Sequence, residues 1–125
     1  FVISGKVGAS FPLIEGSVAG VLLCDTEDSE IEKLIKIAPA TVLEKNESDI
    51  LYSRINECRK KGYCFSGKRN RWQIEVVSTP VRDRDGNIFA AISLIGFPAD
   101  FEKNADLFVS EILKAKKECE AVLNN

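Results

Sequence analysis

The sequence contains no histidine, and aromatic residues make up only 8% of its 125 residues. The absence of imidazole excludes histidine bases, serine–histidine triads and most zinc sites. No apolar run approaches the about 18 residues of a transmembrane helix, and no signal peptide is visible. Acidic and basic residues nearly balance, 19 against 17. This balance disfavours a free-standing nucleic-acid binder, because such domains usually carry a strong basic excess.

Methionine is also absent and the chain begins at Phe1, so we expect a fragment of a longer protein. Hydrophobic residues make up 45% and charged residues 29%, as in one globular domain. The cysteines form neither a C-x-x-C pair nor a metal knuckle; they are Cys24, Cys58, Cys64 and Cys119. This spacing favours reduced, mostly buried thiols in a cytoplasmic protein. We expect no cofactor, no metal and no membrane association.

The order of apolar patterns and chain breakers predicts one α+β domain over residues 1–125 rather than an alternating βαβ chain. Helices are expected over 11–24, 27–38, 46–62 and 101–123. Strands are expected over 1–4, 63–65, 72–83 and 87–96, and 39–45 is expected to be a loop. Thr26 and Asn46 are the expected N-caps, and Gly62 is expected to end its helix in a left-handed conformation. Gly20 weakens the first helix, so close packing must hold it.

The dipeptide Asp85-Gly86 between two β-rich runs predicts a hairpin with a two-residue type I′ turn. The resulting register places Ser78 opposite Ser93 and Val76 opposite Ile95. Because strand side chains alternate, these four residues share one face of the sheet. The opposite face carries apolar residues that helix 101–123 is expected to cover; they are Val77, Ile92 and Leu94.

The face with the two serines has two interpretations. If helices 11–24 and 46–62 leave it uncovered, it forms a small concave site with a few polar groups, to which the Gly8-Ala9 turn adds backbone N–H donors. If they cover it, the same face is packed core in which the serines bond to the backbone. Composition alone favours neither interpretation.

Other candidate sites have weaker support. Glycines and Lys6 at residues 5–8 lack the spacing of a phosphate loop and indicate a plain turn. A basic stretch is interpreted mainly as a solvated helix end followed by an exposed loop; the alternative is a surface that contacts phosphate or an acidic partner. The stretch comprises Arg54, Arg59, Lys60, Lys61, Lys68, Arg69 and Arg71. Cations at that helix end could lower the thiol pKa of Cys58 or Cys64, which would suit a redox enzyme. Without histidine or a G-x-S-x-G elbow, a serine nucleophile is excluded.

Three segments carry a family resemblance. VGASFPL at 7–13, followed by Gly16 and Gly20, resembles the entry of the effector-binding domain of IclR-type transcriptional regulators. RKKGYCF at 59–65 is similar to that family's R-x-R-G-Y helix-to-strand junction. PVRDRDGNIFAAISLIG at 80–96 matches its hairpin pattern P-V-x-D-x-x-G-x-x-x-A-A-I-S-x-x-G. The resemblance covers nearly the whole chain in the family's order.

The resemblance implies a GAF-like antiparallel sheet flanked by helices. A winged helix-turn-helix DNA-binding domain and the first effector-domain strands are expected to precede Phe1. The family binds small metabolites, often carboxylates or aromatic acids, is not enzymatic, contacts DNA only through the winged-helix domain, and forms homodimers or homotetramers. Its effector contacts, carried over by position, fall on Gly8, Ala9, Ser66, Val76, Ser78, Ser93 and Ile95.

This sequence departs from the family pattern at the site. Ser66 stands where an acid is common, and Glu75 stands where arginine is common. Ile95 replaces a serine, which makes the site more apolar and favours a less polar effector. Two alternatives stay open: a GAF-fold redox enzyme that uses a cysteine such as Cys64, and a GAF-like sensor module of another signalling protein.

Overall fold

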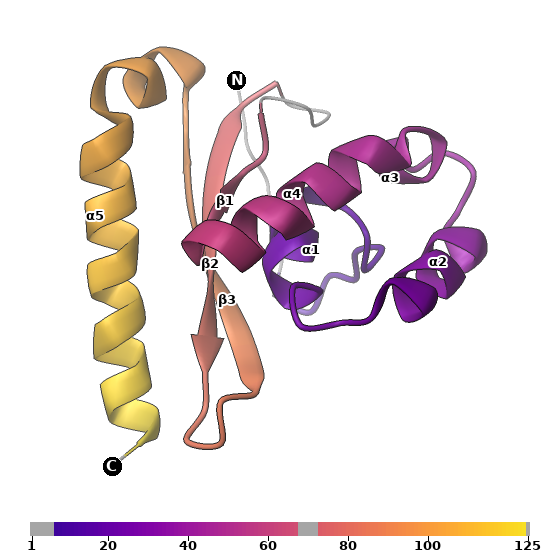
Figure 1. The fold of residues 1–125 in the computed structure, drawn as a ribbon. Coiled ribbons are helices and arrows are strands. Elements are labelled where there is room, and N and C mark those ends of the chain that lie inside the picture. The colour runs from indigo at the N-terminus through magenta and orange to yellow at the C-terminus, as the bar shows by residue number, and fades with distance from the viewer. Residues whose placement is uncertain (1–6, 68–72, 125) are drawn as a thin grey trace.

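The computed structural model describes residues 7–67 and 73–124, and the expected strand at 1–4 lies outside them. The elements in chain order are α1 (Gly16–Leu22), α2 (Asp28–Ile37), α3 (Leu43–Asn46), α4 (Ser48–Lys61), β1 (Cys64–Phe65), β2 (Glu75–Arg82), β3 (Ile88–Gly96) and α5 (Pro98–Leu123). Helices α1 to α4 lie on one side of the sheet and α5 lies on the other (Figure 1). This arrangement confirms the predicted α+β class.

Helix α1 is shorter than the predicted 11–24. Gly16 takes a left-handed φ of +78°, which no helix interior tolerates, and the chain before it makes a turn in which Glu15 N donates to Pro12 O. The predicted N-cap at Thr26 is also wrong. Helix α2 begins one residue later, with Glu27 in the N-cap position and no side-chain cap. Its end before Pro39 is confirmed, because the residue that precedes a proline is pushed out of the helical region.

The predicted loop at 39–45 contains the short helix α3, which brings the buried Glu44 against α4. Asn46 does not cap α4. Its side-chain amide instead donates to the carbonyls of Ala40 and Val42, so it closes the turn before α3. The predicted end of α4 is confirmed: Gly62 has φ +84° and its N–H bonds to Cys58 O.

The sheet is antiparallel in the order β1-β2-β3. The predicted register is confirmed, with Ser78 opposite Ser93 and Val76 opposite Ile95. The predicted two-residue turn is wrong, because only Gly86 takes a positive φ, whereas a type I′ turn requires it at two positions. Gly86 N bonds to Asp83 O and Asp83 N bonds to Asn87 O, so the loop has one residue more than predicted.

A bulge next to the turn restores the predicted register. Arg82 pairs with Ile88, but Val81 pairs with Ala90, so Phe89 is an additional residue on β3. Its side chain is 66% exposed. The additional loop residue and the bulge offset each other, and the hairpin therefore has the expected face alternation despite a different turn.

Helix α5 covers the sheet face that the sequence predicted, packing Phe101 and Ile112 against Val77, Ile92 and Leu94. It begins earlier than predicted, at Pro98, because proline suits the first helical turn. Short β1 pairs only with residues 77 and 78 of β2. Farther along β2, two α5 side chains bond its backbone: Lys116 donates to Pro80 O and Glu120 accepts from Arg82 N.

The buried residues form three clusters. One holds α1, α2 and α4 together around Ile31, Leu51 and Ile55, and another joins α5 to the sheet. The smallest contains Val21 and three cysteines between α1, α4 and β1. Within residues 7–67 and 73–124, no helix is both long and apolar enough to span a membrane.

Candidate functional site

The centre of the candidate site is a chain of three serine hydroxyls. Ser78 on β2 and Ser93 on β3 lie directly opposite each other, with their Oγ atoms 2.7 Å apart. Ser17, from the first turn of α1, places its Oγ 2.8 Å from that of Ser78. Ser78 is fully buried and Ser93 is half-buried, so the chain runs from the interior toward the surface. Sequence reasoning found the pair on the sheet but not Ser17, which comes from a remote segment.

Gly20 allows α1 to lie this close to the sheet. A Cβ at position 20 would be 2.7 Å from Cys64 Sγ and 2.8 Å from Arg54 Cβ, closer than real Cβ contacts. The close packing predicted for this glycine is therefore confirmed. Helix α1 covers Ser78, as the packed-core interpretation expected, but Ser78 bonds there to the Ser17 hydroxyl rather than to the backbone.

The other end of the same face is open. Val76 and Ile95 are cross-strand partners, and Ile95 is 55% exposed. The surface beside the half-buried Ser93 is therefore apolar and accessible. This combination matches the composition of ligand sites, which are mostly apolar with a few placed polar groups.

Ser66 and Glu75, two of the departures from the family pattern, form one buried cluster. Ser66 Oγ donates to Glu75 Oε1 at 2.7 Å and accepts from Val76 N at 3.1 Å. Glu75 Oε1 also accepts from the backbone N–H groups of Gly67 and Val76. The serine hydroxyl and two backbone N–H groups thus satisfy the buried carboxylate of Glu75.

Arg54 belongs to this polar cluster and not to the predicted basic surface. It is 3% exposed, donates through Nη1 to Glu44 Oε2 at 2.6 Å and donates through Nη2 to Ser66 O at 2.8 Å. Glu44 Oε2 also accepts from Gly16 N at 3.0 Å. The buried Arg54–Glu44 ion pair thus links the beginning of α1 to Ser66, the residue that follows β1, and no local sequence pattern predicts this link.

Of the rest of the basic stretch, Arg59 and Lys61 contact other residues of the protein, Lys60 is exposed, and the loop cations lie outside the described residues. Arg59 donates to the carbonyls of Cys24 and Thr26 and pairs with Asp28. Lys61 pairs with Glu57 one turn earlier. Lys68, Arg69 and Arg71 lie outside the described residues. The interpretation as a solvated helix end is supported for Arg59, Lys60 and Lys61, which are all exposed.

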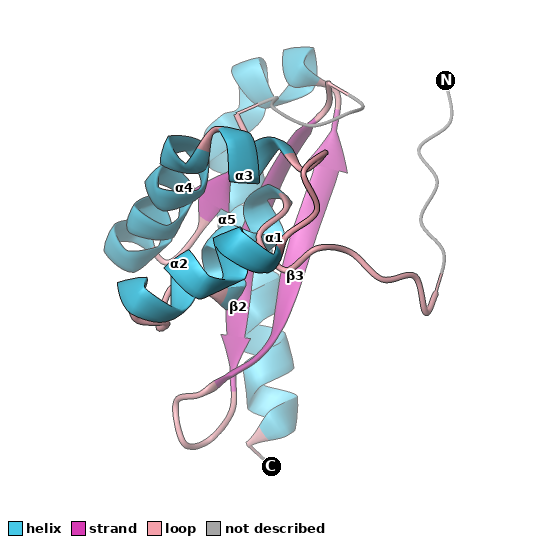
Figure 2. Cartoon of the chain, turned by 90° about the vertical axis from the view of Figure 1, so that its right-hand side faces the viewer, coloured by secondary structure: helices cyan, strands magenta, loops and turns pink. Residues whose placement is uncertain are grey.

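The structure does not bring Gly8 and Ala9 to the serine face. Both are exposed, and a Cβ built on Gly8, whose φ is +85°, would meet no described atom within 4 Å. Figure 2 shows the stretch before α1 extending away from the sheet and helices. Their predicted role as backbone donors is therefore not realised in this conformation.

Two surface cavities are lined by described residues near the sheet. One, of about 430 Å³, lies between α4 and β1 and includes Ser66, Arg54 and Glu57. The other, of about 420 Å³, is an apolar groove between the hairpin and the end of α5. Neither includes Ser78 or Ser93.

The predicted activation of Cys58 and Cys64 by nearby cations is wrong. Burial raises the pKa of the Cys64 thiol to about 12. A hydrogen bond to Cys24, followed by burial, raises the pKa of Cys58 well above its usual range. Among the described residues, no group of three or more cysteine and carboxylate side chains is arranged to hold a metal ion.

Comparison with known proteins identifies the family. The family model for the "Bacterial transcriptional regulator IclR C-terminal" matches residues 2–120. A search of curated proteins finds no match. The chain is similar to the C-terminal domain of the E. coli transcriptional regulator KdgR, with TM-score 0.71, 19% identity, and coverage of 91% of this chain and 72% of that one.

Two further solved structures have the same fold. The Agobacterium tumefaciens repressor BlcR aligns with TM-score 0.77 and 19% identity over 98% of this chain, which spans only 51% of that protein. The inducer-binding domain of PobR from Acinetobacter, a double mutant in complex with 3-hydroxybenzoic acid, aligns with TM-score 0.68 and 17% identity over 88% of this chain and 66% of that one. Identities this low show a common fold alone. The family match over residues 2–120 shows that this chain belongs to the effector-binding C-terminal domains of IclR-type transcriptional regulators.

Proposed function

We propose that this domain binds a small aromatic or carboxylic acid on the open end of the serine face. The observation that carries the proposal is the Ser17–Ser78–Ser93 hydroxyl chain, which ends at the surface beside the exposed Ile95. Val76 and Ile95 offer an apolar surface for a ring, and the half-buried Ser93 offers a hydroxyl for its polar substituent. The complex of PobR with 3-hydroxybenzoic acid is a precedent for such a ligand on this fold.

Ile95 favours a ligand that is less polar than those of relatives with serine there. A small dicarboxylate would leave a charge against this apolar surface, and an unpaired charge removed from water is costly. Ser66 and Glu75 lie beside Val76 but already satisfy each other, so they border the site rather than supply its main polar contact.

Signal transmission would begin at α1, because Ser17 on that helix bonds to Ser78. A ligand that bonds to the Ser93 hydroxyl either displaces Ser78 from it or fixes the orientation of the Ser93–Ser78–Ser17 hydrogen bonds. In both cases the ligand favours one position of α1 over another. In a homodimer or homotetramer whose winged-helix domains contact DNA, that preference would change the spacing of the DNA-binding domains. Catalysis forms no part of this function.

The experiment is a ligand screen on purified protein, with aromatic acids, including 3-hydroxybenzoate, and small dicarboxylates as probes. We expect aromatic acids to raise the melting temperature, and titration calorimetry to give at least about tenfold weaker binding for Ser93→Ala, which loses about one hydrogen bond to a charged or polar group. Ser110→Ala on the exposed face of α5 is the matched control and should bind as the parent does. Stabilisation by dicarboxylates alone, or equal loss in both variants, would contradict the proposal.

The alternative of a cysteine-dependent redox enzyme makes a distinct prediction. Cys64 is fully buried and burial raises its thiol pKa, both of which oppose a role as nucleophile. Replacing Cys64 with serine should leave ligand binding intact and remove no peroxide- or sulfoxide-dependent turnover. Turnover that the parent shows and this variant lacks would favour the enzyme.

A further inference from the structure

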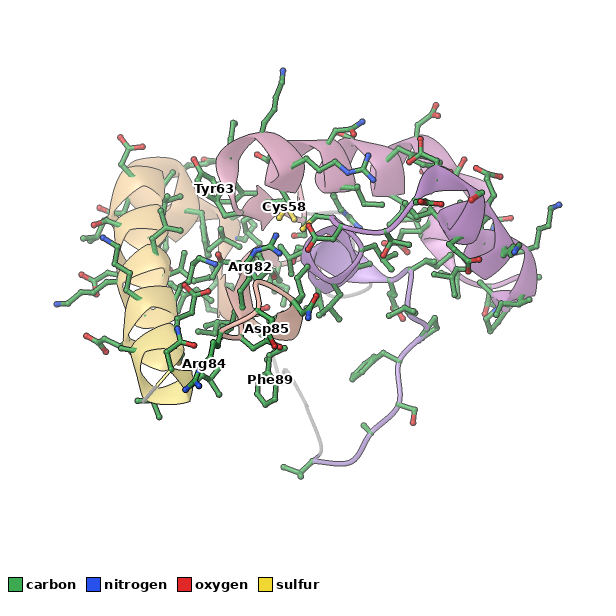
Figure 3. All side chains as sticks on the ribbon, turned by 60° about the horizontal axis from the view of Figure 1, so that its bottom comes forward. Cys58, Tyr63, Arg82, Arg84, Asp85 and Phe89 are labelled. Carbon is green, nitrogen blue, oxygen red and sulfur yellow. The ribbon has the colours of Figure 1, made fainter. Side chains whose placement is uncertain are left out.

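Three thiols from separate elements gather in one buried cluster. Cys24 follows α1, Cys58 lies in the last turn of α4, and Cys64 begins β1. Figure 3 shows sulfur atoms close together beside the labelled Cys58. Cys24 is 6% exposed, against 3% for Cys58 and 0% for Cys64. A solute therefore reaches the cluster first at Cys24.

Polar groups surround the Cys24 sulfur on the solvent side. Arg82 Nη2 donates to it at 3.8 Å, and its own S–H faces Asp25 Oδ1 at 3.7 Å. Asp25 holds the Arg82 guanidinium through both oxygens, at 2.5 and 3.0 Å. From the interior side, Cys58 packs in the same buried cluster as Cys24, whereas Cys64 Sγ donates to Ser17 O. A cation thus points at the Cys24 sulfur and a second thiol packs beside it, an arrangement that favours a thiolate at Cys24.

The electrostatic balance favours Cys24 as the reactive thiol of the three. The hydrogen bond from Cys58, with a smaller contribution from the Arg82 charge, lowers the pKa of Cys24 to about 7, although burial and Asp25 oppose the shift. The pKa values of Cys58 and Cys64 move upward instead. A thiolate next to a protonated thiol is the pairing that a resolving cysteine requires.

We propose that Cys24 and Cys58 form an oxidisable pair, in which hydroperoxides convert the two thiols to an intramolecular disulfide. The Cys24 thiolate attacks one peroxide oxygen, the O–O bond breaks, and the sulfur is oxidised to a sulfenic acid while the other oxygen leaves as water or alcohol after protonation. Oxidation of Cys24 removes the thiolate that is the main cause of the raised pKa of Cys58, and the Cys58 sulfur then attacks the Cys24 sulfur. The S–S bond forms, the S–OH bond breaks, and the hydroxide leaves as water with the Cys58 proton.

The disulfide would join α1 to α4 at the end of α1 opposite Ser17. That short helix covers the serine face, and Cys64 Sγ, the third thiol of the cluster, donates to Ser17 O at 3.3 Å. Oxidation would therefore act on the element that carries Ser17 without using any residue of the proposed ligand surface. The inference does not depend on the identity of an effector.

The experiment oxidises the chain with hydrogen peroxide and maps the products. Trypsin cuts after lysine and arginine, so Cys24, Cys58 and Cys64 fall in separate peptides, at 7–33, 55–59 and 62–68. Using Cys119→Ser removes the exposed thiol that could cross-link two chains. We expect a loss of two free thiols per chain, a linked pair of peptides 7–33 and 55–59, and recovery of both thiols with dithiothreitol.

Matched variants distinguish this pair from general oxidation of buried thiols. Cys64→Ser should still form the same linked peptides, whereas Cys24→Ser should retain the Cys58 and Cys64 thiols. Iodoacetamide should modify Cys24 at least about 100-fold faster than Cys64 at neutral pH, since the thiolate fractions differ more than that. A link to Cys64, irreversible oxidation of Cys24 without a link, or equal labelling of Cys24 and Cys64 would each overturn the proposal. Peptide mapping of the Cys119→Ser protein decides the question even if a Cys24 variant fails to fold.

Discussion

Replacing Arg54 with methionine should destabilise the domain severely, because it leaves the buried carboxylate of Glu44 without its cation. Glu44 is 2% exposed, and its remaining partner would be the N–H of Gly16. Breaking a buried ion pair from one side costs about 3–5 kcal/mol. The carbonyl of Ser66 also loses its donor, which adds about 1 kcal/mol. Methionine keeps most of the aliphatic stem of arginine, so the loss reports the charge and hydrogen bonds rather than a cavity.

Urea unfolding followed by circular dichroism measures this loss. We expect Arg54→Met to lower the free energy of unfolding by about 4–6 kcal/mol, enough to unfold much of a marginally stable domain. The double variant Arg54→Met with Glu44→Leu should recover part of the loss, because no buried charge is then left alone. Lys33→Met is the control: its pair with Glu30 is exposed, and its loss should cost less than about 1 kcal/mol. The reasoning is refuted if Arg54→Met and Lys33→Met unfold at the same urea concentration.

Two further predictions concern the packing and charge around the same helices. Gly20→Ala would place a methyl group 2.7 Å from Cys64 Sγ, so we expect a loss of about 1–3 kcal/mol in urea unfolding; no loss would show that α1 does not lie this close to the sheet. The hydrogen bond from Arg82 lowers the pKa of Asp25 in the folded state, so its stabilising effect is present above the unfolded pKa of about 4 and is lost as the pH falls through the folded value. Asp25→Asn should therefore flatten the fall in urea midpoint on acidification, and parallel curves for the two proteins would count against this pairing.

Part of the candidate site could be predicted from local sequence. The alternation of side chains along two strands is enough to place Ser78 and Ser93 on one face, provided that the register is known. The register prediction succeeded although the turn was wrong, because the additional residue at the turn and the bulge at Phe89 offset each other. Gly20 was also identified as a point of close packing, since a glycine inside a helix needs such a reason.

Other parts of the site depend on segments that meet only in the folded chain. Ser17 reaches Ser78 across 61 positions, and Arg54 reaches Glu44 across 10, through a short helix that the sequence did not predict. No sequence periodicity predicts these pairs, because each residue taken alone is typical of a turn, an exposed position or a helix end. The direction of the cysteine pKa shifts is equally inaccessible from sequence, since it depends on burial and on which sulfur faces Arg82.

The sequence by itself determined the α+β class, the face alternation of the hairpin, the left-handed end of α4 at Gly62 and the apolar side of α5, because these depend on side-chain periodicity and on backbone conformations open to few residue types. Only the tertiary structure decided that α1 begins at Gly16, that a buried ion pair anchors it, and that Cys24 rather than Cys64 carries the lowered pKa. Ion pairing, desolvation and close approach act between atoms in space, and the distance between residues along the chain does not encode them.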